Sequence, residues 1–327
     1  MTSLSRDADA AQPAATPAAP LIVAKGLTKR YAKVIALDQF DLELGAGIIG
    51  LVGANGAGKS TFIKLLLGLI EPTSGSAQMM GLDVTRQGTT LRQFVGYMPE
   101  HDCLPGDATA TEFVSHMAQI SGLPGAAARE RTAETLRHVG LFEARYRPIG
   151  GYSTGMKQRV KLAQALVHDP RLVLLDEPTN GLDPQGRDEM LTLIQRIGTE
   201  FGVAVILSSH LLSEIERVCD HLVEIEGGRL VRSSPMAELT AATSILLVEV
   251  DGEVEALAGY LRDREFSAKV NGRYLLIERD GDAVLDAIRD GVVELDLGLV
   301  RMEQGRRRLE ELFGAGQDVE FEGVRPD

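Results

Sequence analysis

Cysteine is scarce in this sequence of 327 residues. The two cysteines, Cys103 and Cys219, belong neither to a CxxC pair nor to a His/Cys cluster with the spacing of zinc ligands. This pattern argues against a structural zinc site. Two isolated thiols in a chain of this length are typical of reduced residues in a cytosolic protein.

Positive charge is also scarce. Lysine and arginine number 34 against 47 aspartates and glutamates, which gives a formal net charge of −13 and an isoelectric point of about 5.0. Because phosphate backbones are bound by basic surfaces, this balance argues against nucleic acid as the main partner. It also argues against simple electrostatic docking on an anionic leaflet. The negative charge balance is still compatible with a small basic patch or a protein-binding groove.

Long apolar runs are missing as well. No window approaches the ~18 consecutive apolar residues that indicate a transmembrane helix. Residues 1–20 are rich in alanine and proline and lack the basic and apolar regions of a signal peptide, so we expect a disordered leader there. If the protein acts at a membrane, we expect it to do so through another chain.

The rest of the chain has the 44% hydrophobic and 25% charged residues of an ordinary globular protein. Helical patterns occur over Thr61–Ile70, between Thr109 and Leu141, and after Asp183-Pro184, and they alternate with strand signals. This alternation predicts an α/β fold with a mostly parallel sheet. The predicted strands of this part are Leu21–Gly26, Asp38–Leu44, Ile48–Val52, Val95–Pro99, Leu172–Leu175 and Val203–Leu207.

The pattern changes after Glu238. The expected elements are a strand at Ser244–Val250, a helix at Glu253–Arg262, a strand at Tyr274–Arg279, a helix at Asp282–Asp290, a strand at Val292–Leu297 and a helix at Arg306–Phe313. We therefore expect an α/β domain over residues 21–240 and a small α+β accessory domain over residues 241–327, with a ferredoxin-like order of elements.

A glycine-rich segment, Gly53-Ala-Asn-Gly-Ala-Gly-Lys-Ser-Thr61, matches the P-loop pattern GxxxxGK[ST]. An apolar strand precedes it and a helical pattern follows it, as the motif requires. Glycines let backbone N–H groups close around phosphate oxygens, and the helix N-terminus adds partial positive charge. We expect Lys59 to reach the β- and γ-phosphates and Ser60 to bind Mg²⁺. The candidate nucleotide-binding residues are Gly53, Asn55, Gly56, Gly58, Lys59, Ser60 and Thr61.

Two adjacent carboxylates, Asp176 and Glu177, follow the predicted strand Leu172–Leu175. Ligands of parallel α/β sheets bind at the carboxyl ends of the strands. Downstream of a P-loop we expect Asp176 to hold Mg²⁺ and Glu177 to act as the general base toward an attacking water. Without that context, a solvated strand end would be the better explanation of the pair. These residues indicate a P-loop NTPase, a class that includes kinases, GTPases, helicases and transport motors.

The segment Tyr152-Ser-Thr-Gly-Met-Lys-Gln-Arg159 narrows the class. It resembles the LSGGQ signature of ABC proteins, with Thr154 in place of the first glycine and Met156 in place of the glutamine. With the P-loop, Gly181-Leu-Asp183 and His210, it makes residues 21–239 resemble an ABC-family ATP-binding subunit. The resemblance implies a parallel sheet core with an antiparallel β subdomain and a helical subdomain, ATP and Mg²⁺ as cofactors, and ATP hydrolysis. Similar signature variants occur in export-type members.

The resemblance also implies roles for single residues. Ser153 and Gly155 would touch the γ-phosphate of an ATP molecule held by the opposite subunit, and Asp183 would contact that subunit as well as cap a helix. Tyr31 would stack on adenine. His210 would contact the γ-phosphate and the attacking water.

Glu100 departs from the family, which has glutamine at this position. A carboxylate here can still accept a hydrogen bond from Mg²⁺-bound water or bind the cation itself. In the family, the same segment faces the transmembrane partner.

In the resembled family the P-loop and the signature of one chain face different ATP molecules. With one copy of each, the resemblance implies a dimer, expected to be a homodimer with two composite sites. The resemblance further implies a separate transmembrane permease, a place at the cytoplasmic face of the cell membrane, and export. One alternative is a soluble ABC ATPase in translation or DNA maintenance, but the sequence has neither a second cassette nor a long coiled coil. Another alternative, an inactive nucleotide binder, is opposed by Lys59, Asp176, Glu177 and His210.

Overall fold

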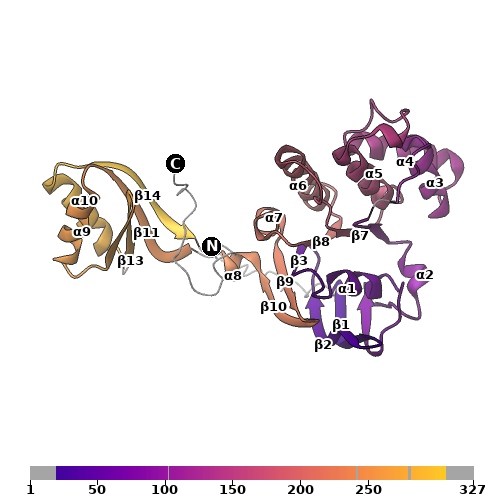
Figure 1. The fold of residues 1–327 in the computed structure, drawn as a ribbon, viewed down its shortest axis with the longest axis horizontal. Helices are drawn as coiled ribbons and strands as arrows, with labels where there is room; N and C mark the ends of the chain where they lie inside the picture. Colours follow the sequence, from indigo (N-terminus) through magenta and orange to yellow (C-terminus); the bar gives the residue numbers. More distant parts are fainter. Residues whose placement is uncertain (1–19, 102, 241, 279–280, 307–327) are drawn as a thin grey trace, which may run out of the picture.

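The computed structural model describes residues 20–101, 103–240, 242–278 and 281–306 (Figure 1). These residues form a six-stranded sheet of order β10-β9-β3-β8-β7-β6 and two four-stranded sheets of order β2-β1-β4-β5 and β12-β13-β11-β14. Apart from Pro20, the predicted leader lies outside the described residues. No helix within the described ranges is long and apolar enough to cross a bilayer.

The six-stranded sheet is mostly parallel. Its strands are β3 (Ile48–Val52), β6 (Val95–Met98), β7 (Leu172–Asp176), β8 (Ala204–Ser209), β9 (His221–Glu226) and β10 (Arg229–Pro235). All neighbouring pairs are parallel except β9 and β10. Every residue of β3, β7 and β8 is buried, as continuous apolar runs predict. The predicted α/β fold is confirmed.

The register of this sheet aligns the carboxyl ends of its strands. Asp176 pairs with Ser208, and Val52 pairs with Ser209. Because parallel strands point the same way, the loops that follow β3, β6, β7 and β8 leave the sheet at one edge. The sheet thereby brings the P-loop to the segments that follow Asp176 and Ser209.

An antiparallel sheet covers the other side of the P-loop helix. It consists of β1 (Ile22–Tyr31), β2 (Val34–Leu44), β4 (Ser74–Met79) and β5 (Leu82–Asp83). Helix α1 (Lys59–Leu66) shares one apolar core with both sheets, and the Phe40 and Phe62 ring centroids lie 5.0 Å apart. The helix ends before the predicted Ile70, because Gly68 takes a left-handed φ of 62° close to its end.

A helical layer lies beside β6 and β7, at the upper right of Figure 1. It contains α3 (Ala110–Ile120), α4 (Gly125–His138) and α5 (Thr154–Leu166). The predicted capping box is confirmed, because Thr109 Oγ1 accepts from Glu112 N and Glu112 Oε2 accepts from Thr109 N. The other helices of this part are α2 (Gly88–Leu91), α6 (Pro184–Thr199), α7 (Leu212–Val218) and α8 (Met236–Leu239).

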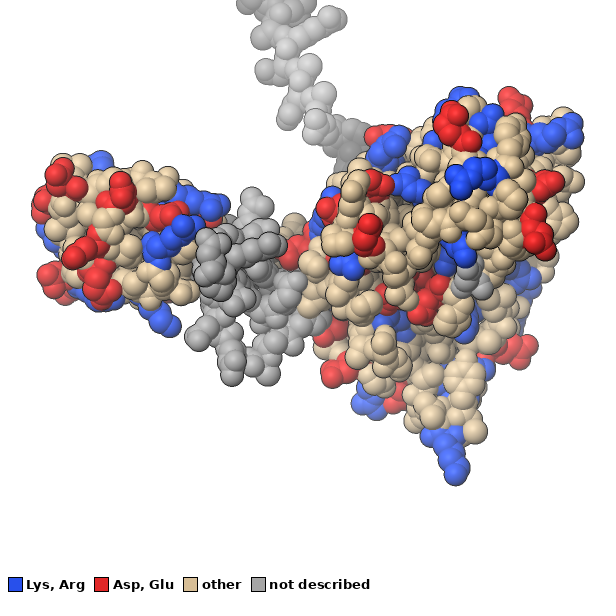
Figure 2. All heavy atoms as spheres, turned by 45° about the horizontal axis from the view of Figure 1, so that its top comes forward, with Lys and Arg blue, Asp and Glu red and all other residues tan. Residues whose placement is uncertain are grey.

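The last sheet forms a separate α+β unit, at the left of Figure 1. Its elements are β11 (Ala242–Asp251), α9 (Val254–Arg262), β12 (Ala268–Asn271), β13 (Tyr274–Glu278), α10 (Ala283–Glu294) and β14 (Gly298–Arg306). The antiparallel order β12-β13-β11-β14 fits the expected ferredoxin-like order of elements, although β12 was not among the predicted strands. Both helices pack on one face through Leu257, Leu261 and Ile288. On the face drawn in Figure 2, acidic and basic side chains are interspersed over this unit and the larger part alike.

Two predictions in this unit are wrong. Val292–Leu297 is not a strand, because α10 continues to Glu294. Val284, Ile288, Val292 and Leu295 recur at helical spacing and pack on the same core, which outweighs the β-branched valines. The final strand follows instead, at Gly298–Arg306, so no helix begins at Arg306. The rest of that predicted helix, residues 307–313, lies outside the described residues.

Candidate active site

The P-loop leaves β3 as a turn that only glycine can make. Gly56 and Gly58 have φ values of 85° and 116°, in a region that other residues rarely adopt. A Cβ on Gly53 would lie 2.2 Å from a carbonyl oxygen of β9, so no side chain fits there. Asn55 is exposed at the tip of the loop, and Thr61 lies in the first turn of α1. The backbone N–H groups of such a loop can close around phosphate oxygens.

The P-loop side chains meet the end of β7. Lys59 is buried, and its Nζ donates to Gly53 O at 2.5 Å and lies 3.7 Å from Glu177 Oε1. The Ser60 hydroxyl lies 3.4 Å from Asp176 Oδ1. Residues more than a hundred positions apart in the chain therefore form one polar group, as the motifs predict.

A serine of β8 holds both carboxylate residues. Ser208 Oγ donates to Asp176 Oδ1 at 2.7 Å and accepts from Glu177 N at 2.9 Å. Ser208 has no exposed surface. A single hydroxyl thus fixes one side chain and the backbone of its neighbour. Sequence reasoning missed this residue, because its role comes from the register of two strands rather than from a motif.

Glu177 has an unusual backbone and a partly exposed partner. Its φ is 50°, a left-handed conformation that a non-glycine residue keeps only where its surroundings enforce it. Its Oε2 lies 2.8 Å from His210 Nδ1, and the His210 side chain is 50% exposed while that of Glu177 is 9% exposed. His210 therefore orients the Glu177 carboxylate close to solvent.

The segment after β6 brings Glu100 close to this group. Burial, with the charge of Asp176 as the next cause, raises the pKa of Tyr97 to about 12. Asn180 Nδ2 donates to Glu100 Oε1 at 3.4 Å. Lys161 of α5 donates to the backbone oxygens of Pro99 and Glu100, both at 2.8 Å. This lysine, which sequence reasoning also missed, ties the signature helix to the Glu100 segment.

Tyr31 lies apart from these contacts, at the end of β1 opposite Val34. The residue is 43% exposed, and Lys29 Nζ lies 5.1 Å from its ring centroid. The next strand, β2, passes close to the P-loop: a Cβ on Gly58 would lie 2.5 Å from Ala36 O. An exposed ring at this place has the flat face that stacking on a base requires.

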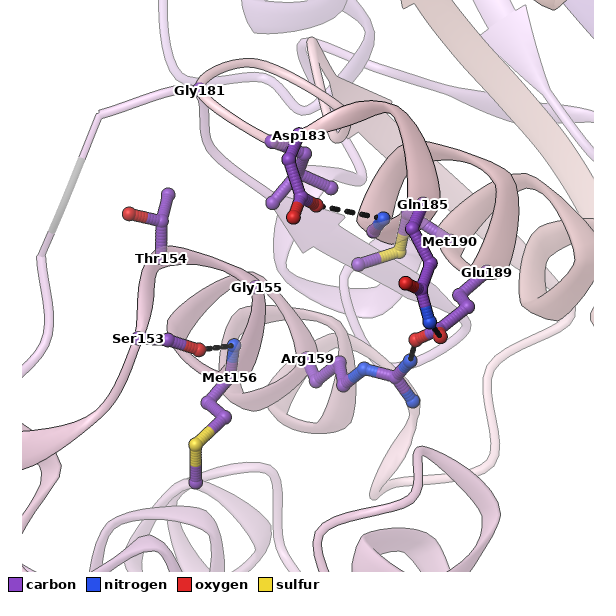
Figure 3. Close-up of a pocket in the computed structure, with 12 residues that line it drawn as sticks. Ser153, Thr154, Gly155, Met156, Arg159, Gly181, Asp183, Gln185, Glu189 and Met190 are labelled. Atoms are coloured by element: carbon purple, nitrogen blue, oxygen red, sulfur yellow. Dashed lines mark hydrogen bonds and ion pairs between the residues drawn. The ribbon is translucent and has the colours of Figure 1, made fainter.

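The remaining predicted residues line a cavity of about 530 Å³ (Figure 3). Ser153 caps α5, because its Oγ accepts from Met156 N at 3.3 Å, and Gly155 follows in the first turn. Across the cavity, Asp183 caps α6 by accepting from Gly186 N at 2.8 Å, which confirms the predicted cap. None of the residues that line this cavity comes from the P-loop or from the group around Glu177. The structure therefore places the predicted nucleotide contacts on two different surfaces.

The donors near Asp176 fit a magnesium ion that arrives with a nucleotide. Within the described part of the chain, no group of three or more His, Cys, Asp or Glu side chains forms a ready-made metal site. Mg²⁺ needs fewer protein ligands, because one or two side chains and phosphate oxygens usually hold it. The Ser60 hydroxyl and the Asp176 carboxylate meet this requirement. Glu100 contacts Asn180 instead, so its predicted place among the metal ligands stays a prediction.

Comparisons with known proteins agree with this geometry. The family model described as ABC transporter matches residues 37–180. A Bacillus subtilis protein, the uncharacterised ABC transporter ATP-binding protein YxlF, is 35% identical over 275 residues, which cover 81% of this chain and 88% of that protein. The daunorubicin/doxorubicin resistance ATP-binding protein DrrA of Streptomyces peucetius is 33% identical over 307 residues, covering 89% and 91% of the two chains.

A solved structure gives the same result for the fold. The structure of cbiO1 from Clostridium perfringens, part of the ABC transporter complex cbiONQ, is 27% identical and has a TM-score of 0.61 over 67% of this chain and 90% of that one. The family resemblance predicted from the motifs is thereby confirmed. Identity of this order along most of both chains makes the protein a member of the ABC transporter ATP-binding family, and an ATPase.

Proposed function

We propose that the chain is one half of a homodimer that binds two ATP molecules with Mg²⁺, hydrolyses them and drives a separate transmembrane permease. The observation that carries this proposal is the division of the candidate nucleotide contacts between two surfaces of one chain. A nucleotide on the P-loop surface reaches a signature surface when a second copy supplies it. Both ATP molecules then lie between the subunits.

The P-loop surface has the groups that phosphoryl transfer to water requires. The loop N–H groups and Lys59 bind the β- and γ-phosphates, and Ser60 and Asp176 hold Mg²⁺, which neutralises phosphate charge when it is bound. Glu177 accepts a proton from the water whose oxygen attacks the γ-phosphorus, while the bond to the β–γ bridging oxygen breaks and ADP leaves. His210, 2.8 Å from Glu177, orients that carboxylate and contacts the γ-phosphate.

The signature surface completes the site from the other subunit. The Ser153 hydroxyl and the N-terminus of α5 present donors and partial positive charge to a γ-phosphate. Asp183 contacts the second copy at the same boundary, and Tyr31 stacks on the adenine of its own subunit. ATP therefore favours the closed dimer, and hydrolysis lets it open, because the two states bind the nucleotide differently.

The work of this cycle is delivered to a membrane protein. We place the dimer at the cytoplasmic face of the cell membrane, held there by the permease and contacting it through the segment Tyr97–Glu100. The similarity to the daunorubicin/doxorubicin resistance ATP-binding protein supports export as the direction of transport. The relatives are transporter subunits, so they support this function over a soluble ATPase of translation or DNA maintenance.

Two substitutions test the site. Glu177→Gln keeps the shape of the side chain and removes its basicity, so we expect ATP binding to persist, turnover to fall by roughly 10²–10⁴-fold, and a dimer to accumulate with ATP. Lys59→Ala is expected to weaken ATP binding itself. The matched controls are Glu43→Gln and Lys64→Ala, which change exposed residues of β2 and α1. Unchanged turnover in the first variant, or unchanged affinity in the second, contradicts the assigned role.

A further inference from the structure

A second buried carboxylate lies behind the group around Glu177. Glu214 belongs to α7 and is 2% exposed. Its Oε2 accepts from Thr179 Oγ1 at 2.8 Å and from Ser209 Oγ at 2.7 Å. Its Oε1 lies 3.2 Å from Arg187 Nε as an ion pair. A buried carboxylate is costly unless it is paired and hydrogen-bonded, and Glu214 has both kinds of contact.

The two hydroxyls belong to the segments that carry Glu177 and His210. Thr179 is buried two residues after Glu177, in a turn where Asn180 N donates to Glu177 O. Ser209 directly precedes His210, and its Oγ also accepts from Leu211 N at 3.0 Å. The Ser209 hydroxyl therefore links the residue before His210 to the backbone of the residue after it. A single carboxylate oxygen of Glu214 holds the two segments together.

The third contact extends this connection to the signature cavity. Arg187 lies in the first turn of α6, and its N–H donates to Asp183 O at 2.9 Å. Asp183 lines the cavity described above and is our candidate for the contact with the second subunit. The ion pair of Arg187 with Glu214 thus joins this end of α6 to the segments around Glu177 and His210.

We propose that Glu214 is a positioning residue, which holds Glu177 and His210 in register with each other and with the Asp183 end of α6. The inference rests on the proposed roles of Glu177 and His210. Glu177 needs such support, because a non-glycine residue at a φ of 50° keeps its conformation only when its neighbours enforce it. The side-chain hydrogen bonds and the ion pair of Glu214 reach neither a P-loop residue nor a residue of the cavity lining, so we expect it to act on turnover rather than on ATP affinity.

The test uses Glu214→Gln and Glu214→Ala in the full-length protein. The glutamine oxygen can still accept from the Thr179 and Ser209 hydroxyls. Its NH₂ group, however, faces the Arg187 guanidinium, and both of these groups are hydrogen-bond donors. We expect kcat to fall roughly tenfold with glutamine and further with alanine, while KM for ATP stays within about twofold. The matched control is Glu200→Gln, which breaks an exposed ion pair with Arg196 at the other end of α6.

A spectroscopic readout separates positioning from general loss of structure. The side-chain NMR resonances of His210, assigned with His210→Gln, report its hydrogen bond to Glu177. We expect them to shift in Glu214→Gln while the other histidine resonances stay in place. Ser209→Ala, which removes one of the two hydroxyls and leaves the carboxylate paired with Arg187, is expected to give a smaller change of the same kind.

The failure of this inference differs from the failure of the proposed site. If Glu177→Gln abolishes turnover but Glu214→Gln keeps full kcat and unshifted His210 resonances, the positioning role is wrong. An increase in KM with kcat unchanged also overturns it. If Glu177→Gln itself keeps turnover, the assigned site is wrong and the inference falls with it. Should the Glu214 variants not fold, Ser209→Ala decides, since normal kcat and unshifted His210 resonances there contradict the proposal.

Discussion

Replacing Ser208 with alanine tests how the protein holds the carboxylate residues at the end of β7. The change leaves the Glu177 N–H buried without an acceptor and removes a donor 2.7 Å from Asp176 Oδ1. Each such loss costs roughly 1–3 kcal/mol, so we expect the free energy of unfolding to fall by about 3 kcal/mol. For a domain of this size, that corresponds to a decrease in Tm of roughly 6–12 °C.

The same change is expected to lower turnover. With Asp176 and Glu177 less firmly held, we expect kcat to fall at least about tenfold, while KM for ATP stays within about twofold, because the P-loop is untouched. Scanning calorimetry and a phosphate-release assay measure the two effects. Ser76→Ala, which removes an exposed hydroxyl from β4, is the control. A Ser208→Ala protein with an unchanged Tm and full kcat refutes the reasoning.

Three further predictions concern the P-loop and two helix caps. Gly58→Ala places a Cβ 2.5 Å from a backbone oxygen, whereas the Cβ of Gly56→Ala meets nothing within 4 Å. Titration with ATP should therefore show a larger loss of affinity for Gly58→Ala than for Gly56→Ala. Equal losses contradict this prediction. Asp183→Ala removes a helix cap, so the free energy of unfolding measured by chemical denaturation should fall by about 1 kcal/mol, while Asp183→Asn keeps the cap. A loss of activity in Asp183→Asn at unchanged stability reports the subunit contact. Full activity in that variant argues against the contact. The bond from Thr109 N lowers the pKa of Glu112, so this carboxylate stabilises the fold above its unfolded pKa and loses that effect as pH falls through its folded value. The Tm difference between the native chain and Glu112→Gln should thus shrink as the pH falls below about 4.3, and a constant difference rules out this linkage.

The sequence predicted those features whose causes are local. Ile48–Val52 is a strand at the predicted residues, because a continuous apolar run flanked by glycine suits only the buried centre of a parallel sheet. The caps of α3 and α6 were predicted for the same reason, since a capping side chain acts within three residues. The P-loop, Asp176 and Glu177 followed from motifs of fixed spacing.

Contacts between distant segments could not be predicted where no motif marks the residues. Ser208 matters because the sheet register places it opposite Asp176, 32 residues away. Glu214 bonds Thr179 across 35 residues, and no local pattern indicates a buried glutamate on a short helix. The end of α10 was misjudged because packing against the C-terminal core, rather than the β propensity of Val292, decides its length.

The central claim is that this ATPase drives a separate membrane protein. The most direct test is to purify the Glu177→Gln protein from gently solubilised native membranes, held closed with ATP and Mg²⁺, and to identify its partners by mass. We predict a polytopic membrane protein in an amount that matches the ATPase. A ribosome, a DNA complex or no partner at all would contradict the claim.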